Sequence, residues 1–300
     1  MGSIETAEVQ KQNSALPVPG CKMRLIMAVR FYGDESEDKE EKVHAIAGFI
    51  GFAEDWDRLQ EEWISRVKPT GVSAYHMTDC DNGWGEFSEK KGWTKTDRDQ
   101  LTKDLIEMIC RHGVYLIGMA VMLDDYKTLQ PLNDEGEMLG HDKWHLAFQF
   151  VLREACSRVG DEAPPKETVA FFFDWKTKQG VAKRLFDYTM GLDRLQPWHK
   201  RLETLTFGHK EFDVPGSIPL LQVADIAAVE SRKVLANSIT HPHLPERRSL
   251  ARLKECNRVW SIRYLDKPVI DMLYEDKRRK MALLNKYEET FFKLKKLRSD

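Results

Sequence analysis

The sequence predicts an α/β fold in which one mixed β-sheet is flanked by helices. Two apolar, strand-like segments come first, at 24–32 and 43–52, and helical and strand-like segments alternate after them. This order is typical of a single sheet whose faces are covered by helices. No internal repeat, low-complexity tract or linker divides the 300 residues. We therefore expect one domain with additional C-terminal helices.

The first elements are predicted by residue type and spacing. Residues 24–32 are mostly β-branched, aromatic or otherwise apolar, which predicts a strand ending at Gly33-Asp34-Glu35-Ser36. An acidic, hairpin-like connection leads to the second strand, at 43–52, where Gly48 indicates close packing or a bulge. Apolar residues at helical spacing then predict a helix at 54–67.

The middle of the chain begins with an irregular stretch at 72–93 that is rich in Gly, Asp and aromatic residues. A helix is expected from Thr96, a candidate N-cap, to His112. Residues 114–123 are almost continuously apolar, which predicts a strand covered on both faces. A polar loop follows at 130–140.

The same reasoning gives alternating elements in the second half. Helices are expected at 142–159, 181–192 and 218–235, and strands at 168–173 and 203–207.

The two ends of the chain differ from this pattern. Residues 1–20 are polar and are expected to be a disordered lead-in to a domain at 21–240. Residues 241–300 are expected to be a helical extension packed on the same domain, with helices at 246–256 and in the basic segment 277–298. That basic segment is either an amphipathic helix with a solvated charged face or a surface that contacts phosphates.

Composition limits the class of protein. A hydrophobic share of 42% and a charged share of 31% are those of a soluble globular protein. No apolar run approaches the roughly 18 residues that cross a bilayer, and the N-terminus lacks the features of a secretory signal, so no membrane association is expected. An odd number of cysteines without a Cys-x-x-Cys pair predicts a reducing, cytoplasmic setting. The net charge of −2 does not decide for or against nucleic acid, and nothing indicates the oligomeric state.

Three aspartates stand in apolar surroundings. Asp34 and Asp174 follow apolar strands, although an Asp at a strand end is also a common turn residue. Asp225 lies in an apolar helix with Gln222 on the same side, three residues away. A carboxylate there is costly unless it is paired, hydrogen-bonded or bound to a metal, and a buried ion pair with an Arg is the competing explanation. Together the three acids predict a site for Mg²⁺ or Mn²⁺, which take hard oxygen ligands and promote phosphodiester hydrolysis.

The same residues carry a family resemblance. The segment 31–36, with its Asp34-Glu35-Ser36 triplet, resembles the opening "YxDES" strand of the DUF3800 proteins, a family of unknown function related to the ribonuclease H fold. Segment 74–79 resembles the family's "FHxxD" motif, and Ser217 with 221–227 resembles its closing "S…LQxADxxA" signature. The resemblance covers about 23–232 and departs at Glu37, where relatives often have Gly. It implies a ribonuclease H-like mixed sheet, and nuclease activity only by analogy.

The resemblance implies roles for the acids. Asp34, Asp174 and Asp225 would be the metal ligands. Glu35 would be a fourth catalytic acid, although strand alternation turns it away from Asp34 and Ser36.

Further residues are candidates for substrate binding or proton transfer. His76 and Asp79 could orient water, take a proton or contact substrate, and a structural role for His76 is the alternative. Gln222 could hold a carboxylate or a phosphate, and Ser217 could cap the helix or serve the site. Trp84, in a Gly-rich loop, could stack on a base.

Three functions follow from these residues. The first is a metal-dependent phosphodiesterase, specifically a nuclease, which requires Asp34, Asp174 and Asp225 to converge. The second is a non-catalytic module of the same fold that binds nucleic acid or a protein partner. The third is an enzyme acting on a small phosphorylated substrate in a narrow pocket.

Overall fold

The structure, a computed structural model, describes residues 28–265 apart from 39, 41, 128–142, 163–166, 176–178, 192–199 and 241. The expected lead-in at 1–20, the loop at 130–140 and the basic helix at 277–298 lie outside the described residues. No helix in the described part of the chain is long and apolar enough to cross a membrane.

The described strands form one mixed sheet in the order β5-β4-β1-β2-β3-β6. β2 runs antiparallel to β1 and β3, whereas β4 is parallel to β1 and β5, and β6 is parallel to β3. The strands are β1 Val29–Asp38, β2 Val43–Phe52, β3 Val114–Met122, β4 Val169–Asp174, β5 Leu202–Gly208 and β6 Val259–Leu265. The predicted α/β class with a mixed sheet is confirmed.

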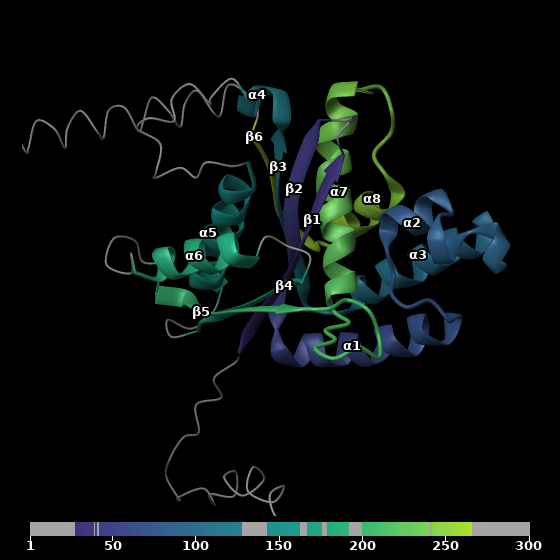
Figure 1. Cartoon of the computed structure of the whole chain (residues 1–300), viewed down its shortest axis with the longest axis horizontal. Helices are drawn as coiled ribbons and strands as arrows, with labels where there is room; N and C mark the ends of the chain where they lie inside the picture. Colours follow the sequence, from purple (N-terminus) through teal and green to yellow (C-terminus); the bar gives the residue numbers. More distant parts are fainter. Residues whose placement is uncertain are drawn as a thin grey trace, which may run out of the picture.

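Helices cover both faces of this sheet (Figure 1). α5 and α6 lie on one face, and α7 crosses the other, next to β1 and β2, with α1 and α3 beyond it. The helices are α1 Ala53–Val67, α2 Met77–Asn82, α3 Lys95–Arg111, α4 Leu123–Lys127, α5 Lys143–Glu162, α6 Gln179–Gly191, α7 Leu221–Thr240 and α8 Arg248–Glu255. Short 3₁₀ turns occur at Lys68–Thr70, Gly85–Phe87 and Glu89–Lys91.

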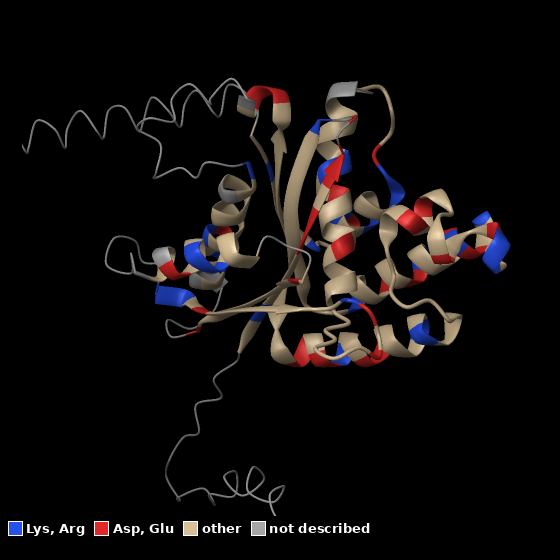
Figure 2. Cartoon of the chain, viewed as in Figure 1, with Lys and Arg blue, Asp and Glu red and all other residues tan. Residues whose placement is uncertain are grey.

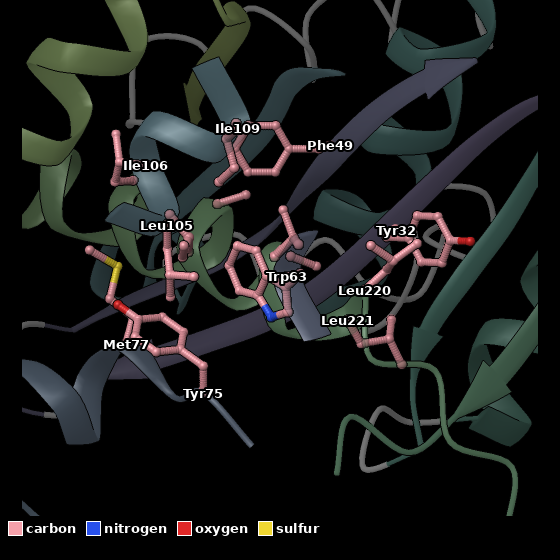
Figure 3. Packing of buried hydrophobic residues seen from close by; sticks show 14 of the residues in the cluster. Tyr32, Phe49, Trp63, Tyr75, Met77, Leu105, Ile106, Ile109, Leu220 and Leu221 are labelled. Atoms are coloured by element: carbon pink, nitrogen blue, oxygen red, sulfur yellow. The ribbon is translucent and has the colours of Figure 1, made fainter. Parts of the chain in front are cut away.

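Strand alternation divides the apolar side chains between two cores. Phe31 packs with α5 and α6, whereas its neighbour Tyr32 packs in the core on the α7 face. Figure 3 shows Trp63 of α1 in the middle of this second core, among Tyr75, Leu105 and Leu220. The face that a β1 residue occupies therefore decides which helices it can meet.

The first strand is longer than the sequence predicts. β1 continues to Asp38 because it stays paired with β2 as far as Asp38 and Val43. Asp34 therefore lies inside a strand and not in a turn at its end. The N-cap of α3 also differs: Thr94, not Thr96, accepts from the Asp97 backbone N–H in a capping box.

Two further elements were not predicted. The short helix α2 forms within the stretch expected to be irregular. Only helices were expected after residue 240, yet β6 forms there and extends the sheet beside β3. The segment 241–265 thus contributes a strand to the same sheet in addition to α8.

Close packing between β1 and β2 depends on glycine. Gly48 lies opposite Gly33, and a Cβ at Gly48 would overlap the carbonyl oxygen of Tyr32 and come within 2.8 Å of the Gly33 Cα. We expect Gly48→Ala to lower the free energy of unfolding by about 1–3 kcal/mol, because a backbone clash in a packed sheet forces the strands apart. Urea denaturation followed by circular dichroism measures this loss. Gly180→Ala is the control, since a Cβ there meets nothing closer than 3.8 Å, and an equal loss in both variants would contradict the packing argument.

Candidate functional site

Three aspartates from distant parts of the chain meet around one lysine. The Nζ of Lys210 lies 2.5 Å from Asp34 Oδ2, 2.9 Å from Asp174 Oδ2 and 3.4 Å from Asp225 Oδ1. Figure 2 marks acidic positions in red within β1 and α7, which lie side by side. We call Asp34, Asp174, Asp225 and Lys210 the acid cluster.

Alternation along the strands explains why two of the acids meet. Asp34 shares a face of β1 with Tyr32, and Asp174 shares a face of β4 with Phe172. The rings of Tyr32 and Phe172 stack with centroids 4.8 Å apart, in the parallel pairing of β1 and β4. Both carboxylates therefore lie on the α7 side of the sheet, where α7 supplies Asp225.

Lys210 reaches the cluster because it follows β5, which pairs with β4. β5 pairs with β4 so that Gly208 lies beside Asp174, and Lys210 follows two residues later. The carboxyl ends of adjacent parallel strands thus deliver Asp174 and Lys210 to the same edge of the sheet. This is where sites in open α/β sheets gather.

All four members of the cluster are buried, so their charges interact strongly. Burial raises the pKa of Asp34 to about 7, with Asp174 and Asp225 adding to the rise and Lys210 opposing it. Burial alone would also raise the pKa of Asp225, but Lys210 and a hydrogen bond from His76 hold it below its usual range. One ammonium does not balance three carboxylates, and the cluster has a negative excess.

Asp225 also binds the segment that begins α2. Its Oδ2 accepts a hydrogen bond of 2.7 Å from the Met77 backbone N–H, and its Oδ1 lies 3.2 Å from His76 Nδ1. Burial lowers the pKa of His76, but the Asp225 carboxylate outweighs it and raises the pKa overall. The His76 side chain is 32% exposed, so it lies between the cluster and solvent.

Gln222 is fully buried. Its Oε1 accepts hydrogen bonds of 3.0 Å from Trp63 Nε1 and from the Tyr75 backbone N–H. Its Nε2 donates to the Lys210 carbonyl oxygen at 2.7 Å. The expectation that Gln222 holds a carboxylate or phosphate is corrected. The hydrogen bonds of Gln222 instead connect α1, the chain before α2 and the chain after β5.

Ser217 does not cap α7, which begins at Leu221. Its hydroxyl instead donates to the Glu211 carbonyl oxygen at 2.6 Å and closes the loop that carries Lys210. Ser217 thus supports the cluster through the backbone of this loop.

Glu35 points away from the cluster, as alternation predicts. Its Oε2 accepts a hydrogen bond of 2.5 Å from Trp144 Nε1 of α5, on the opposite face of the sheet. Ser36, on the Asp34 face, accepts from Arg232 Nε of α7 at 2.9 Å. The expectation that Glu35 is a fourth acid of the site is therefore corrected.

Asp79 and Trp84 are not joined to the cluster. Within the described residues, no hydrogen bond or ion pair connects the Asp79 side chain to the three aspartates. Trp84 is 59% exposed, and its backbone N–H donates to the Asp79 carbonyl oxygen at 2.9 Å. Neither residue acquires a role from these contacts.

Lys210 is the member of the acid cluster that sequence reasoning missed. It stands in a polar His-Lys-Glu triplet, which is typical of a solvated loop. Its position just after the predicted strand at 203–207 is the signal that could have found it, because residues at the carboxyl ends of parallel strands form sites. The competing explanation for Asp225 was a buried ion pair with an Arg. Asp225 does form a buried ion pair, but its cation is Lys210.

The acid cluster presents carboxylate oxygens to a single cation, the Lys210 ammonium. Three carboxylates already surround a single positive charge, and Mg²⁺ and Mn²⁺ take oxygen ligands of this kind. The Lys210 ammonium takes that position in the structure. In the described part of the chain, no group of three His, Cys, Asp or Glu residues is arranged to hold a metal ion.

No protein-family model matches the chain, and no curated protein matches it with a significant score. The resemblance to the DUF3800 proteins stays a prediction from the motifs.

Proposed function

We propose that the protein is a metal-dependent phosphodiester hydrolase, specifically a nuclease, on a ribonuclease H-like domain. The observation that supports it most is the convergence of Asp34, Asp174 and Asp225 on one buried cation. Burying three carboxylates together costs free energy that a core of apolar residues would not, so a functional reason for them is expected.

The topology supports the ribonuclease H-like part of the proposal. β1, β2 and β3 form an antiparallel meander, and β4 and β5 extend it beside β1 as parallel strands. The first acid lies on the central strand β1, the second at the end of β4, and the third on the later helix α7. This order agrees with the motifs on which the resemblance rests.

The aspartates, His76 and Lys210 would have different roles in hydrolysis. Asp34, Asp174 and Asp225 would hold Mg²⁺ or Mn²⁺, which supply an activated water and neutralise charge on the phosphate. His76 uses Nδ1 to contact Asp225, so Nε2 is the ring nitrogen able to take or give a proton at a bound substrate. Lys210 neutralises part of the carboxylate charge and would add positive charge beside the phosphate when a metal is bound.

A non-catalytic module of the same fold is the second candidate. The observation that favours it is the Lys210 ammonium itself, which already contacts all three carboxylates. In that case the acid cluster is a structural ion network, and nucleic acid or a protein partner binds elsewhere.

We also propose that the protein is located in the cytoplasm. Cys80, Cys110, Cys156 and Cys256 are free thiols, which supports a reducing compartment.

Titration of the native protein with Mg²⁺ and Mn²⁺ by isothermal calorimetry tests the proposal. We expect binding that Asp225→Asn abolishes, together with a loss of metal-dependent oligonucleotide hydrolysis of more than about 100-fold, because removal of supporting residues alone costs 10–100-fold. Glu35→Gln is the matched control: this carboxyl is next to Asp34 in sequence but on the other face, and Gln keeps an acceptor for Trp144. Native protein that neither binds metal in the presence of oligonucleotide nor cleaves it would favour the non-catalytic module.

A further inference from the structure

An exposed aromatic pair lies next to the acid cluster in the chain. Trp175 is 52% exposed, which is unusual for so large an apolar side chain. Its ring stacks on that of His209, with centroids 5.3 Å apart and planes inclined by 25°. Trp175 directly follows Asp174, and His209 directly precedes Lys210. Each ring therefore belongs to a residue that is adjacent in sequence to a member of the cluster.

Backbone hydrogen bonds fix both members of the pair. The Trp175 N–H donates to the Gly208 carbonyl oxygen at 2.7 Å, which continues the pairing of β4 with β5. The His209 N–H donates to Gly216 O at 3.0 Å, and the Ile218 N–H donates to His209 O at 2.7 Å. Because both residues are held at strand ends, the indole is presented to solvent from a fixed support.

An aromatic ring that is stacked on a neighbour and half exposed suits a flat ligand. Nucleobases stack on exposed aromatic side chains, and this contact does not depend on the identity of the base. In a duplex both faces of each base are already covered, so an open ring selects unpaired bases. The His209 ring stacked against the indole restricts rotation of the Trp175 side chain.

We propose that Trp175 and His209 form a stacking platform for an unpaired base of single-stranded nucleic acid. The base on this platform places the adjoining phosphodiester at Asp174 and Lys210. The substrate of the site is then a single strand, and Trp175 contributes affinity without reading sequence. The choice of substrate rests on the proposed function, whereas binding to Trp175 does not require catalysis.

Fluorescence anisotropy with a labelled single-stranded oligonucleotide tests the platform. All proteins carry Asp225→Asn, so that cleavage cannot consume the probe. Trp175→Ala is expected to weaken binding about 5-fold to 150-fold, the range for loss of one base–aromatic stack, and Trp175→Phe to retain most of the affinity. Leu244→Ala is the control, because Leu244 is 50% exposed and lies outside the site.

Abasic probes identify the contact as stacking. Probes that each lack one base, at successive positions, are compared. For the protein that keeps Trp175, one of these probes should bind more weakly than the intact strand. For the Trp175→Ala protein, the same probe should bind as well as the intact strand. Equal binding by both proteins, with unchanged thermal melting, would overturn the platform. Duplex or mononucleotide that binds as tightly as the single strand would overturn the proposed substrate class.

The outcome separates this inference from the proposed function. Trp175-dependent binding of single strands without metal-dependent cleavage by the native protein would retain the platform and reject the hydrolase. Cleavage that Trp175→Ala leaves unchanged would retain the hydrolase and reject the platform.

Discussion

Lys210→Met is expected to lower the free energy of unfolding by about 3–5 kcal/mol near pH 8, because it leaves buried carboxylates without their cation. Lys210 Nζ contacts all three aspartates, and the side chain is buried. Methionine keeps most of the length of the lysine side chain and removes its charged end, so loss of packing contributes little. Urea denaturation gives the difference. Lys68→Met is the control: its partner Asp213 lies 2.6 Å away, but both side chains are exposed, and such pairs contribute at most about 1 kcal/mol.

The loss should depend on pH in a defined direction. Burial raises the pKa of Asp34 to about 7, from a usual value of 3.8, while Lys210 opposes the rise. Without Lys210 this pKa rises further. A group whose folded pKa is above its unfolded pKa contributes stability at acidic pH and loses it as the pH rises through the folded value. The deficit of Lys210→Met should therefore be smaller near pH 5 than near pH 8, and a deficit that does not change with pH would contradict the charge argument.

The same variant distinguishes the two candidate functions. A ligand that binds only the folded protein stabilises it according to its concentration and affinity. If the three aspartates can hold a divalent cation, millimolar Mg²⁺ or Mn²⁺ should restore stability to Lys210→Met and have a smaller effect on the native protein. If the acid cluster is only a structural ion network, Lys68→Met and Lys210→Met should respond to the metals equally.

The sequence predicted the acids but not their cation, and the reason is physical. Asp34, Asp174 and Asp225 stand out because each follows or interrupts an apolar run, which is visible in one dimension. Lys210 stands among polar neighbours, and only the pairing of β4 with β5 brings it to Asp174. The free-energy cost of a carboxylate within or beside an apolar run can be recognised from sequence. A cation that is brought to that carboxylate by strand pairing cannot.

Alternation and edge position account for the remaining differences. The opposite orientations of Glu35 and Ser36 follow from the two-residue period of a strand, so they could be predicted. β6 was missed because polar Ser261 and Arg263 interrupt its short apolar run, as suits a strand at the edge of the sheet. Such a run lacks the continuous apolar character by which the buried strands β3 and β4 were identified.

Gln222→Leu is expected to cost about 3–6 kcal/mol of unfolding free energy, because it leaves three buried polar groups without their partner. Those groups are Trp63 Nε1, the Tyr75 N–H and the Lys210 carbonyl oxygen. Gln100→Leu is the matched control: Gln100 is exposed on α3 and its side chain donates to Asp104, so a change within about 0.5 kcal/mol is expected. Equal losses in thermal or urea unfolding would show that the hydrogen bonds of Gln222 contribute nothing beyond those of a surface amide.

Gln222→Glu separates the positioning of Lys210 from the stability of the core. A Glu oxygen can still accept from Trp63 and Tyr75, but its second oxygen faces the Lys210 carbonyl and cannot donate to it unless it is protonated. We therefore expect the variant to remain folded at mildly acidic pH, where the new carboxyl is protonated and still donates. At a pH where it is ionised, we expect it to bind divalent metal about 10–100-fold more weakly, the range for loss of a residue that supports the ligands. Metal affinity equal to that of the native protein would mean that the backbone at Lys210 does not set the geometry of the aspartates. The loop closed by Ser217 and the pairing of β4 with β5 would then be sufficient to hold the acid cluster in place.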